Sequence, residues 1–239
     1  MAFHPDLEGI QAVIFDKDGT LIDHDATWSQ PMLDFALAAA GGDVALSHQL
    51  LVEQGFDPAL GRCVTSDGIA GNTFDVTARR WAQSMNDKGH SDEHVAGALA
   101  QVLAAQVTPV ALPGVPALLK ALRQAGVKVG MATNDSEKGA KDQMSQLGWL
   151  EYFDAVVGSD SGYGGKPQPG MILGCAQRLG VKAEHCAMVG DTDRDTLAGQ
   201  AAGVKVVVAV ANGNKEVAAQ LTQTATIVLD ETQDLLLTL

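Results

Sequence analysis

The chain has 239 residues, which is enough for one large domain or two small ones around a buried core. Its formal net charge of −13 at pH 7 argues against nucleic acid or an anionic membrane as a partner, because both attract basic surfaces. The three cysteines lie far apart without metal-ligand spacing, which favours reduced thiols over a disulfide framework. We see no export signal and no apolar segment of membrane-spanning length, and we therefore expect a cytoplasmic protein, monomeric or homodimeric.

The first motif follows the apolar run of residues 12–14, which predicts a buried strand. Asp16 and Asp18 come directly after it, and Gly19 and Thr20 then turn the chain. Open α/β sheets place their ligands at this end of their strands. On this stretch alone, a strand followed by a solvated acidic turn is the alternative interpretation.

Residues 21–109 show helical patterns and no convincing strand. Four helices are expected there, beginning at Asp25 or Thr27, near Ala45, at Asn72 or Thr73, and at Ser91. Such a segment is too long for an ordinary loop. We therefore expect an all-helical insertion over residues 22–109.

Strands and helices alternate from Pro113 onward. The expected strands cover residues 127–132, 155–157, 186–189, 204–210 and 226–229. This alternation predicts a parallel sheet with right-handed crossovers. The main domain then consists of residues 1–21 and 110–239, interrupted by the insertion.

Polar residues follow three of these strands at their C-terminal ends. They are Asp16 and Asp18, Thr133 and Asn134, and Asp191 and Asp195. Because these ends share one edge of a parallel sheet, four carboxylates should gather in one crevice, where they repel unless a cation is present. Mg²⁺ suits carboxylates, waters and a substrate phosphate. Lys166, in a loop rich in glycine and proline, is expected at the same edge.

Each residue also has a purely structural interpretation. Thr133 alone fits a β-branched strand residue, and Asn134 alone fits a helix cap. Asp195 fits a first-turn acid stabilised by the helix dipole, and Lys166 fits a solvated surface lysine. All of these interpretations would have to hold together at matching strand ends, which favours a functional site.

The motifs together resemble the haloacid-dehalogenase-like superfamily of hydrolases. Its four motifs resemble, in order, Asp16-Lys17-Asp18-Gly19-Thr20, Thr133, Lys166-Pro167, and Gly190-Asp191 with Asp195. The insertion resembles the type-1 cap of the phosphoglycolate-phosphatase-like branch. The resemblance implies a Rossmann-like, doubly wound, mostly parallel sheet with an inserted helical cap. It also implies a Mg²⁺-dependent phosphomonoester hydrolase of a small phosphorylated metabolite.

Carried over residue by residue, the resemblance makes Asp16 the nucleophile that forms an aspartyl-phosphate. Asp18 is then the general acid and base. Thr133 and Asn134 bind the phosphate, and Lys166 neutralises its charge. The implied metal ligands are Asp16, the backbone carbonyl of Asp18, and Asp191, with Asp195 in support.

Substrate choice falls to the insertion. We expect the loop of residues 65–73 to approach the ligand, with Gly71 and Asn72 as substrate-binding residues. Three arginines are further candidates for a substrate carboxylate, against the competing interpretation of surface residues: Arg62, Arg79 and Arg80.

Two other functions compete with hydrolysis. A sugar-phosphate mutase on the same core is the first, although mutases of this branch often have Val where Thr20 stands. A non-catalytic, receiver-like phosphate-binding protein is the second, but a receiver is shorter and lacks a cap.

Overall fold

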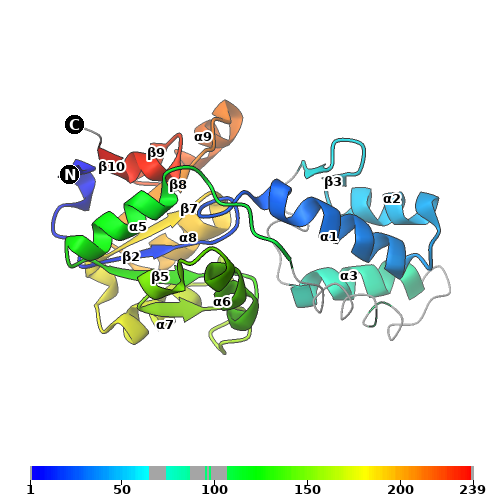
Figure 1. Ribbon diagram of the computed structural model, residues 1–239, viewed down its shortest axis with the longest axis horizontal. Coiled ribbons are helices and arrows are strands. Elements are labelled where there is room, and N and C mark those ends of the chain that lie inside the picture. The colour runs from blue at the N-terminus through cyan, green and yellow to red at the C-terminus, as the bar shows by residue number, and fades with distance from the viewer. Residues whose placement is uncertain (1, 65–73, 87–94, 96, 98–106, 238–239) are drawn as a thin grey trace. The chain divides into compact units, whose positions relative to one another are not determined.

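The computed structural model describes residues 2–64, 74–86, 95, 97 and 107–237 (Figure 1). The chain divides into two compact units. The core unit comprises Met1–Asp23 and Ala111–Leu239, and the inserted unit comprises His24–Val110. Among the described residues, no helix has the length and apolarity needed to span a bilayer.

A six-stranded sheet with the order β6-β5-β2-β7-β8-β9 forms the centre of the core unit. Its strands are β2 (Ala12–Phe15), β5 (Lys128–Ala132), β6 (Ala155–Val157), β7 (Cys186–Gly190), β8 (Val206–Val210) and β9 (Ile227–Leu229). Every pairing in this sheet is parallel, which confirms the predicted fold class. The chain runs outward through β5 and β6 and then returns to β7 on the other side of β2. The topological switch point, where such sheets bind ligands, therefore lies beside β2.

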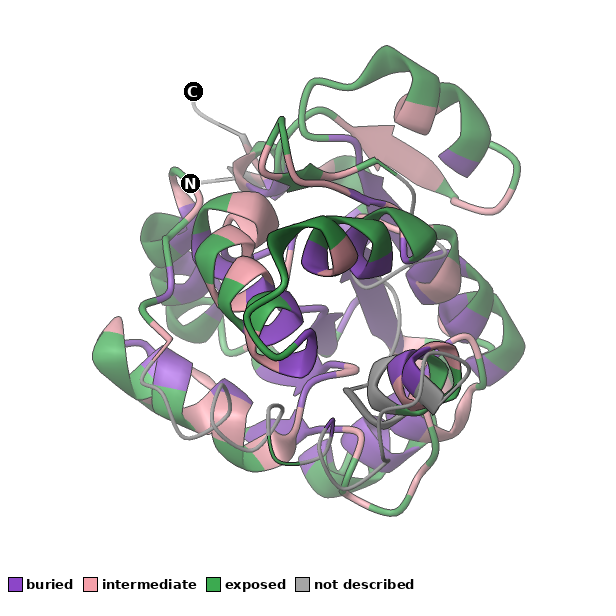
Figure 2. Cartoon of the chain, turned by 90° about the vertical axis from the view of Figure 1, so that its right-hand side faces the viewer, coloured by how far each residue is buried: buried purple, intermediate pink, exposed green. Residues whose placement is uncertain are grey.

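Helices cover both faces of the sheet (Figures 1 and 2). They are α5 (Val115–Gln124), α6 (Glu137–Gln146), α7 (Gly170–Leu179), α8 (Asp193–Ala202) and α9 (Lys215–Leu221). Val13 and Phe15 of β2 pack in one apolar cluster with α5 and α6. Ala12 and Ile14 pack in a second cluster with α7 and α8. Alternate residues of β2 thus pack on opposite faces of the sheet, as expected because successive side chains of a strand point to opposite faces.

Three elements of the core unit were not predicted. The two-residue strands β1 (Ala2–Phe3) and β10 (Leu236–Leu237) pair antiparallel, and both are too short for a periodic signal. Helix α9 begins after Asn214, whose side chain accepts bonds from the next backbone amides. Four short 3-10 helices complete the unit: η1 (Pro5–Leu7), η3 (Leu150–Tyr152), η4 (Ala183–His185) and η5 (Thr232–Leu235).

The inserted unit is mainly helical. It contains α1 (His24–Ala39), α2 (Val44–Glu53) and α3 (Phe74–Asn86), and antiparallel strands β3 (Phe56–Asp57) and β4 (Arg62–Cys63). The expectation of an insertion without strands is therefore wrong, because two-residue strands leave no alternation in the sequence. Phe35 and Trp81 stack in its core, with ring centroids 4.3 Å apart. The loop 65–73 lies outside the described residues, as does the expected helix at Ser91 except for residues 95 and 97, which are helical.

Candidate active site

The turn after β2 places the first pair of aspartates. The Asp16 amide donates to Val189 of the neighbouring β7, and the amides of Leu21 and Ile22 both donate to the Lys17 carbonyl. Gly19 has a φ of +77°, in the left-handed region that favours glycine. A Cβ at Gly19 would lie 2.5 Å from Cγ of Asp191, so the turn also needs a residue without a side chain.

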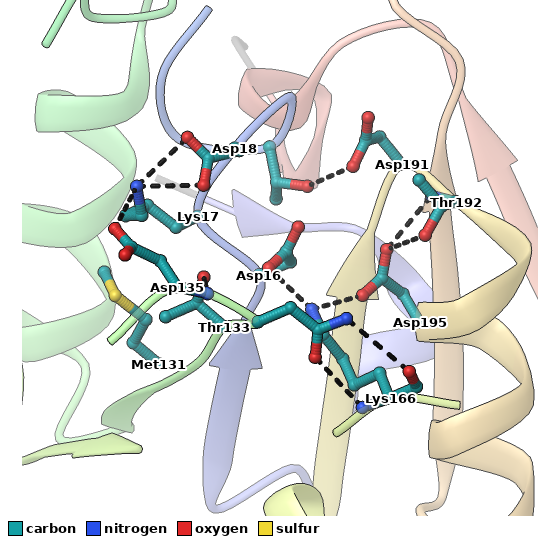
Figure 3. Close-up of polar contacts among 12 residues, drawn as sticks. Asp16, Lys17, Asp18, Met131, Thr133, Asp135, Lys166, Asp191, Thr192 and Asp195 are labelled. Carbon is teal, nitrogen blue, oxygen red and sulfur yellow. Dashed lines mark hydrogen bonds and ion pairs between the residues drawn. The ribbon is translucent and has the colours of Figure 1, made fainter. Parts of the chain in front are cut away.

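Three aspartates converge beside this turn. One carboxylate oxygen each from Asp16, Asp191 and Asp195 lies within 4.8 Å of the other two. Lys166 Nζ donates to Oδ1 of Asp16 and to Oδ1 of Asp195, both at 2.6 Å (Figure 3). The second oxygen of Asp195 accepts bonds from the amide and the hydroxyl of Thr192, at 3.0 and 2.6 Å. Four residues expected at one edge of the sheet thus meet there.

Burial and mutual repulsion disfavour the charged forms of carboxylates in this group. Burial raises the pKa of Asp16 to about 7, although the Lys166 ammonium opposes the shift and Asp195 adds to it. Burial, followed by the charges of Asp195 and Asp16, raises the pKa of Asp191 well above its usual range. For Lys166, burial lowers the pKa, but the two carboxylates outweigh burial and raise it overall. Several close carboxylate oxygens are the donor set of a hard divalent cation, so these residues fit such an ion.

The loop that carries Lys166 is held by the β5 end of the sheet. The Lys166 amide donates to Asn134 Oδ1 at 3.0 Å, and Asn134 Nδ2 donates to the Lys166 carbonyl at 3.5 Å. The Lys166-Pro167 peptide bond is cis. The side chain of Asn134, a predicted substrate-binding residue, therefore contacts the lysine loop.

Thr133 directly follows β5 at the same edge. Its amide donates to Val157 of β6 at 3.0 Å, and its hydroxyl accepts a bond from the Asp135 amide at 3.1 Å. The side chain is buried. Since the hydroxyl accepts this bond, its proton stays available for donation to an anion at the strand end.

Asp18 is placed differently from the other aspartates. Its carboxylate lies outside the three-aspartate group and contacts Lys17, whose Nζ is 2.8 Å from Oδ2 of Asp18. The same Nζ is 3.1 Å from Oδ2 of Asp135 and also donates to Gln143 of α6. Burial lowers the pKa of Lys17, and the charges of Asp18 and Asp135 more than reverse this effect. This cluster was not predicted from the sequence, where neither Lys17 nor Asp135 was assigned a role of its own.

Two further residues support the turn, and the sequence analysis did not assign them this role. Thr20 Oγ1 donates to Oδ1 of Asp191 at 3.4 Å. Asn212, which follows β8 with a φ of 49°, donates from Nδ2 to the Gly19 carbonyl at 2.7 Å. Asparagine adopts the left-handed region more often than most other residues do. An asparagine shortly after a predicted strand is therefore a signal in the sequence for such a turn.

The predicted substrate residues of the insertion are only partly placed. Gly71 and Asn72 lie outside the described residues. Arg62, Arg79 and Arg80 are exposed on the inserted unit.

Comparison with known proteins agrees with this geometry. The family model described as haloacid dehalogenase-like hydrolase matches residues 10–203. A phosphoglycolate phosphatase of Xanthomonas campestris pv. campestris (strain 8004) is 32% identical over 210 residues, which cover 84% of this chain and 83% of the relative.

Two solved structures share the fold. A predicted phosphoglycolate phosphatase from Haemophilus somnus 129pt has a TM-score of 0.65 at 20% identity, covering 95% of this chain and 97% of that one. A putative β-phosphoglucomutase from Thermotoga maritima has a TM-score of 0.63 at 22% identity, with the same coverage.

Proposed function

The chain belongs to the haloacid dehalogenase-like hydrolase family and is a phosphatase, and we propose that it hydrolyses a small phosphorylated metabolite with Mg²⁺ through an aspartyl-phosphate on Asp16. The observation that carries the proposal is the group of Asp16, Asp191 and Asp195 around the buried Lys166. It combines a candidate nucleophile, an ammonium and an oxygen donor set at one strand end.

The proposed reaction has two steps. In the first, a carboxylate oxygen of Asp16 attacks phosphorus, the bond from phosphorus to the ester oxygen breaks, and Asp18 gives that oxygen a proton. In the second, water attacks the aspartyl-phosphate while Asp18 takes a proton from it. The bond between phosphorus and Asp16 then breaks, which releases phosphate and restores both carboxyl groups.

Charge neutralisation and positioning carry most of the acceleration in phosphoryl transfer. Lys166 fixes one oxygen of Asp16 and places a positive charge where the phosphate must approach. Thr133 and Asn134 are proposed to contact the phosphate from the end of β5. A bound Mg²⁺, held by Asp16, Asp191 and the Asp18 carbonyl with Asp195 in support, would supply further positive charge. A protein with a net charge of −13 can thereby receive an anionic substrate locally.

The inserted unit is proposed to select the substrate. Phosphoglycolate is the first substrate to test, because the relative from Xanthomonas is named for it. A sugar-phosphate mutase is the competing function, since a putative β-phosphoglucomutase shares the fold. Release of inorganic phosphate from a panel of phosphoglycolate, sugar phosphates and nucleotides supports hydrolysis, whereas conversion of one sugar phosphate to its isomer supports the mutase.

The decisive experiment is hydrolysis of p-nitrophenyl phosphate with Mg²⁺ and with EDTA, for the wild type and Asp16→Asn. We expect EDTA and the substitution each to abolish turnover, because one removes the cation and the other the nucleophile. Asp193→Asn is the matched control, because Asp193 is an exposed acid at the start of α8 close in sequence to Asp195. Normal turnover by Asp16→Asn would refute the mechanism, and equal loss in the control would show an unspecific charge effect.

A further inference from the structure

A second buried lysine lies on the other side of Asp16 from Lys166 (Figure 3). Lys17 has no exposed side-chain surface, and its Nζ lies 3.0 and 2.8 Å from the two oxygens of Asp18. The same ammonium also contacts Asp135 and Gln143. The ammonium thus donates hydrogen bonds to Asp18 and Gln143 and forms an ion pair with Asp135.

Filling space does not require a lysine at this position. A buried ammonium is costly to desolvate, and exchanging buried ion pairs for apolar residues of similar volume is often neutral or stabilising. A methionine would fill the space without any polar partner. What the ammonium supplies, and a methionine would not, is the two-oxygen contact with Asp18 together with the contacts to Asp135 and Gln143.

The exposures of the pair indicate which partner faces the substrate. The Asp18 side chain keeps 18% of its surface exposed, whereas Lys17 keeps none. Lys17 is in turn held by contacts with two other parts of the core unit, Asp135 after β5 and Gln143 in α6. The Asp18 carboxylate, and not the lysine, is therefore the member of the pair that reaches solvent.

We propose that Lys17 is a positioning residue for Asp18, holding its carboxylate in one orientation for proton transfer with the ester oxygen. The inference rests on the proposed function, in which Asp18 is the general acid and base. In this proposal Lys17 acts through Asp18 and not on the substrate itself. Its contribution should therefore depend on how much the leaving group needs a proton.

The test compares two substrates in Lys17→Met. An alkyl phosphate such as glycerol 2-phosphate needs a proton on its leaving oxygen, whereas p-nitrophenolate leaves without one. Because general acid catalysis contributes about 10²–10⁴-fold, we expect the kcat/KM ratio of alkyl to aryl substrate to fall about tenfold or more. KM for both substrates should change little. The ratio does not depend on the folded fraction, so partial unfolding of the variant cannot imitate the effect.

Two further variants separate positioning from disturbance of the cluster. Asp135→Asn disturbs the same buried group but keeps the Lys17–Asp18 pair, so its ratio should stay near that of the wild type. Lys17→Met combined with Asp135→Asn removes one charge of each sign, so we expect this double variant to fold. Its ratio of kcat/KM for the alkyl and aryl substrates should stay low. An unchanged ratio in both lysine variants, or an equal fall in Asp135→Asn, would overturn the proposal.

Asp18→Asn distinguishes this inference from the function on which it rests. If Asp18→Asn lowers the ratio and Lys17→Met does not, only the positioning role of Lys17 fails. If Asp18→Asn also leaves the ratio unchanged, Asp18 is not the general acid, and the proposed mechanism fails with the inference.

Discussion

Substituting Gly19 by alanine tests whether the turn and the acidic group form one structure. A Cβ at this position would lie 2.5 Å from Cγ of Asp191. Carbon atoms in contact are about 3.5–4.0 Å apart, so the carboxylate must move back by about 1 Å. Asp191 is also a proposed metal ligand, and the displacement should therefore affect function beyond its effect on folding.

The substitution has two separable costs. Gly19 has a φ of +77°, and a left-handed conformation costs a residue with a Cβ about 1–2 kcal/mol. The clash with Asp191 comes in addition, and a misplacement of about 1 Å in an active site can reduce activity about a hundredfold. We therefore expect Gly19→Ala to lower stability moderately and turnover severely.

Gly203→Ala is the matched control. Gly203 follows α8 with a φ of +70°, and a Cβ there would meet nothing within 4 Å, so this variant has the backbone strain without the clash. The measurements are thermal unfolding, the rate with p-nitrophenyl phosphate, and the Mg²⁺ concentration needed for half-maximal rate. We expect both variants to melt below the wild type, Gly19→Ala by the larger margin because of the clash, with a weaker Mg²⁺ response only in Gly19→Ala. Equal activity and equal Mg²⁺ dependence in both would show that the Asp191 position does not matter, and would refute the reasoning.

Three further variants probe the surroundings. Lys166→Met leaves Asp16 buried without its ammonium, and since breaking a buried pair costs about 3–5 kcal/mol, both turnover and the melting temperature should fall. Asn134→Ala removes the acceptor of the Lys166 amide, and steady-state kinetics should show a loss of about tenfold in kcat/KM while thermal stability is kept. Glu137→Gln concerns only stability: the hydrogen bond from Lys141 is the largest cause that lowers the pKa of Glu137 from 4.5 to about 2. Because the folded-state pKa is the lower one, the stabilisation is present above pH 4.5 and disappears toward pH 2. The variant should therefore melt about 1–3 °C lower at pH 7 and equally near pH 2; a difference that persists at pH 2 would contradict this assignment.

The sequence predicted the central strands well, because each is a short apolar run that ends in polar residues. The parallel pattern predicted that the C-terminal ends of these strands share one edge of the sheet. The structure adds that β2 lies directly between β5 and β7, which brings Asp16 and Asp191 together. The pairing of β1 with β10 was not predictable in this way. It joins residues more than two hundred positions apart through two-residue strands, and nothing local in the sequence encodes such a contact.

The burial of Lys17 was not predictable from the sequence either, for a different reason. Lysine is rarely fully buried unless it is paired, so Lys17 taken alone predicts a solvated side chain. Its burial depends on partners that the fold supplies from other elements, Asp135 between β5 and α6 and Gln143 within α6. A charged residue inside a motif is therefore interpretable only when the residues of neighbouring strand ends are considered together.

The pairing of charges around the crevice indicates where a cation is needed most. Lys166 bridges Asp16 and Asp195, and the second buried lysine bridges Asp18 and a carboxylate of the β5 turn. Within the described part of the chain, Asp191 forms no ion pair and accepts a long side-chain hydrogen bond, 3.4 Å, from Thr20. Its carboxylate nevertheless lies in the same group of oxygens as two others. Asp191 is therefore the carboxyl group of this cluster that lacks a paired ammonium in the described ranges, and a divalent cation bound there would favour its charged form, close to the nucleophile on which the phosphate must react.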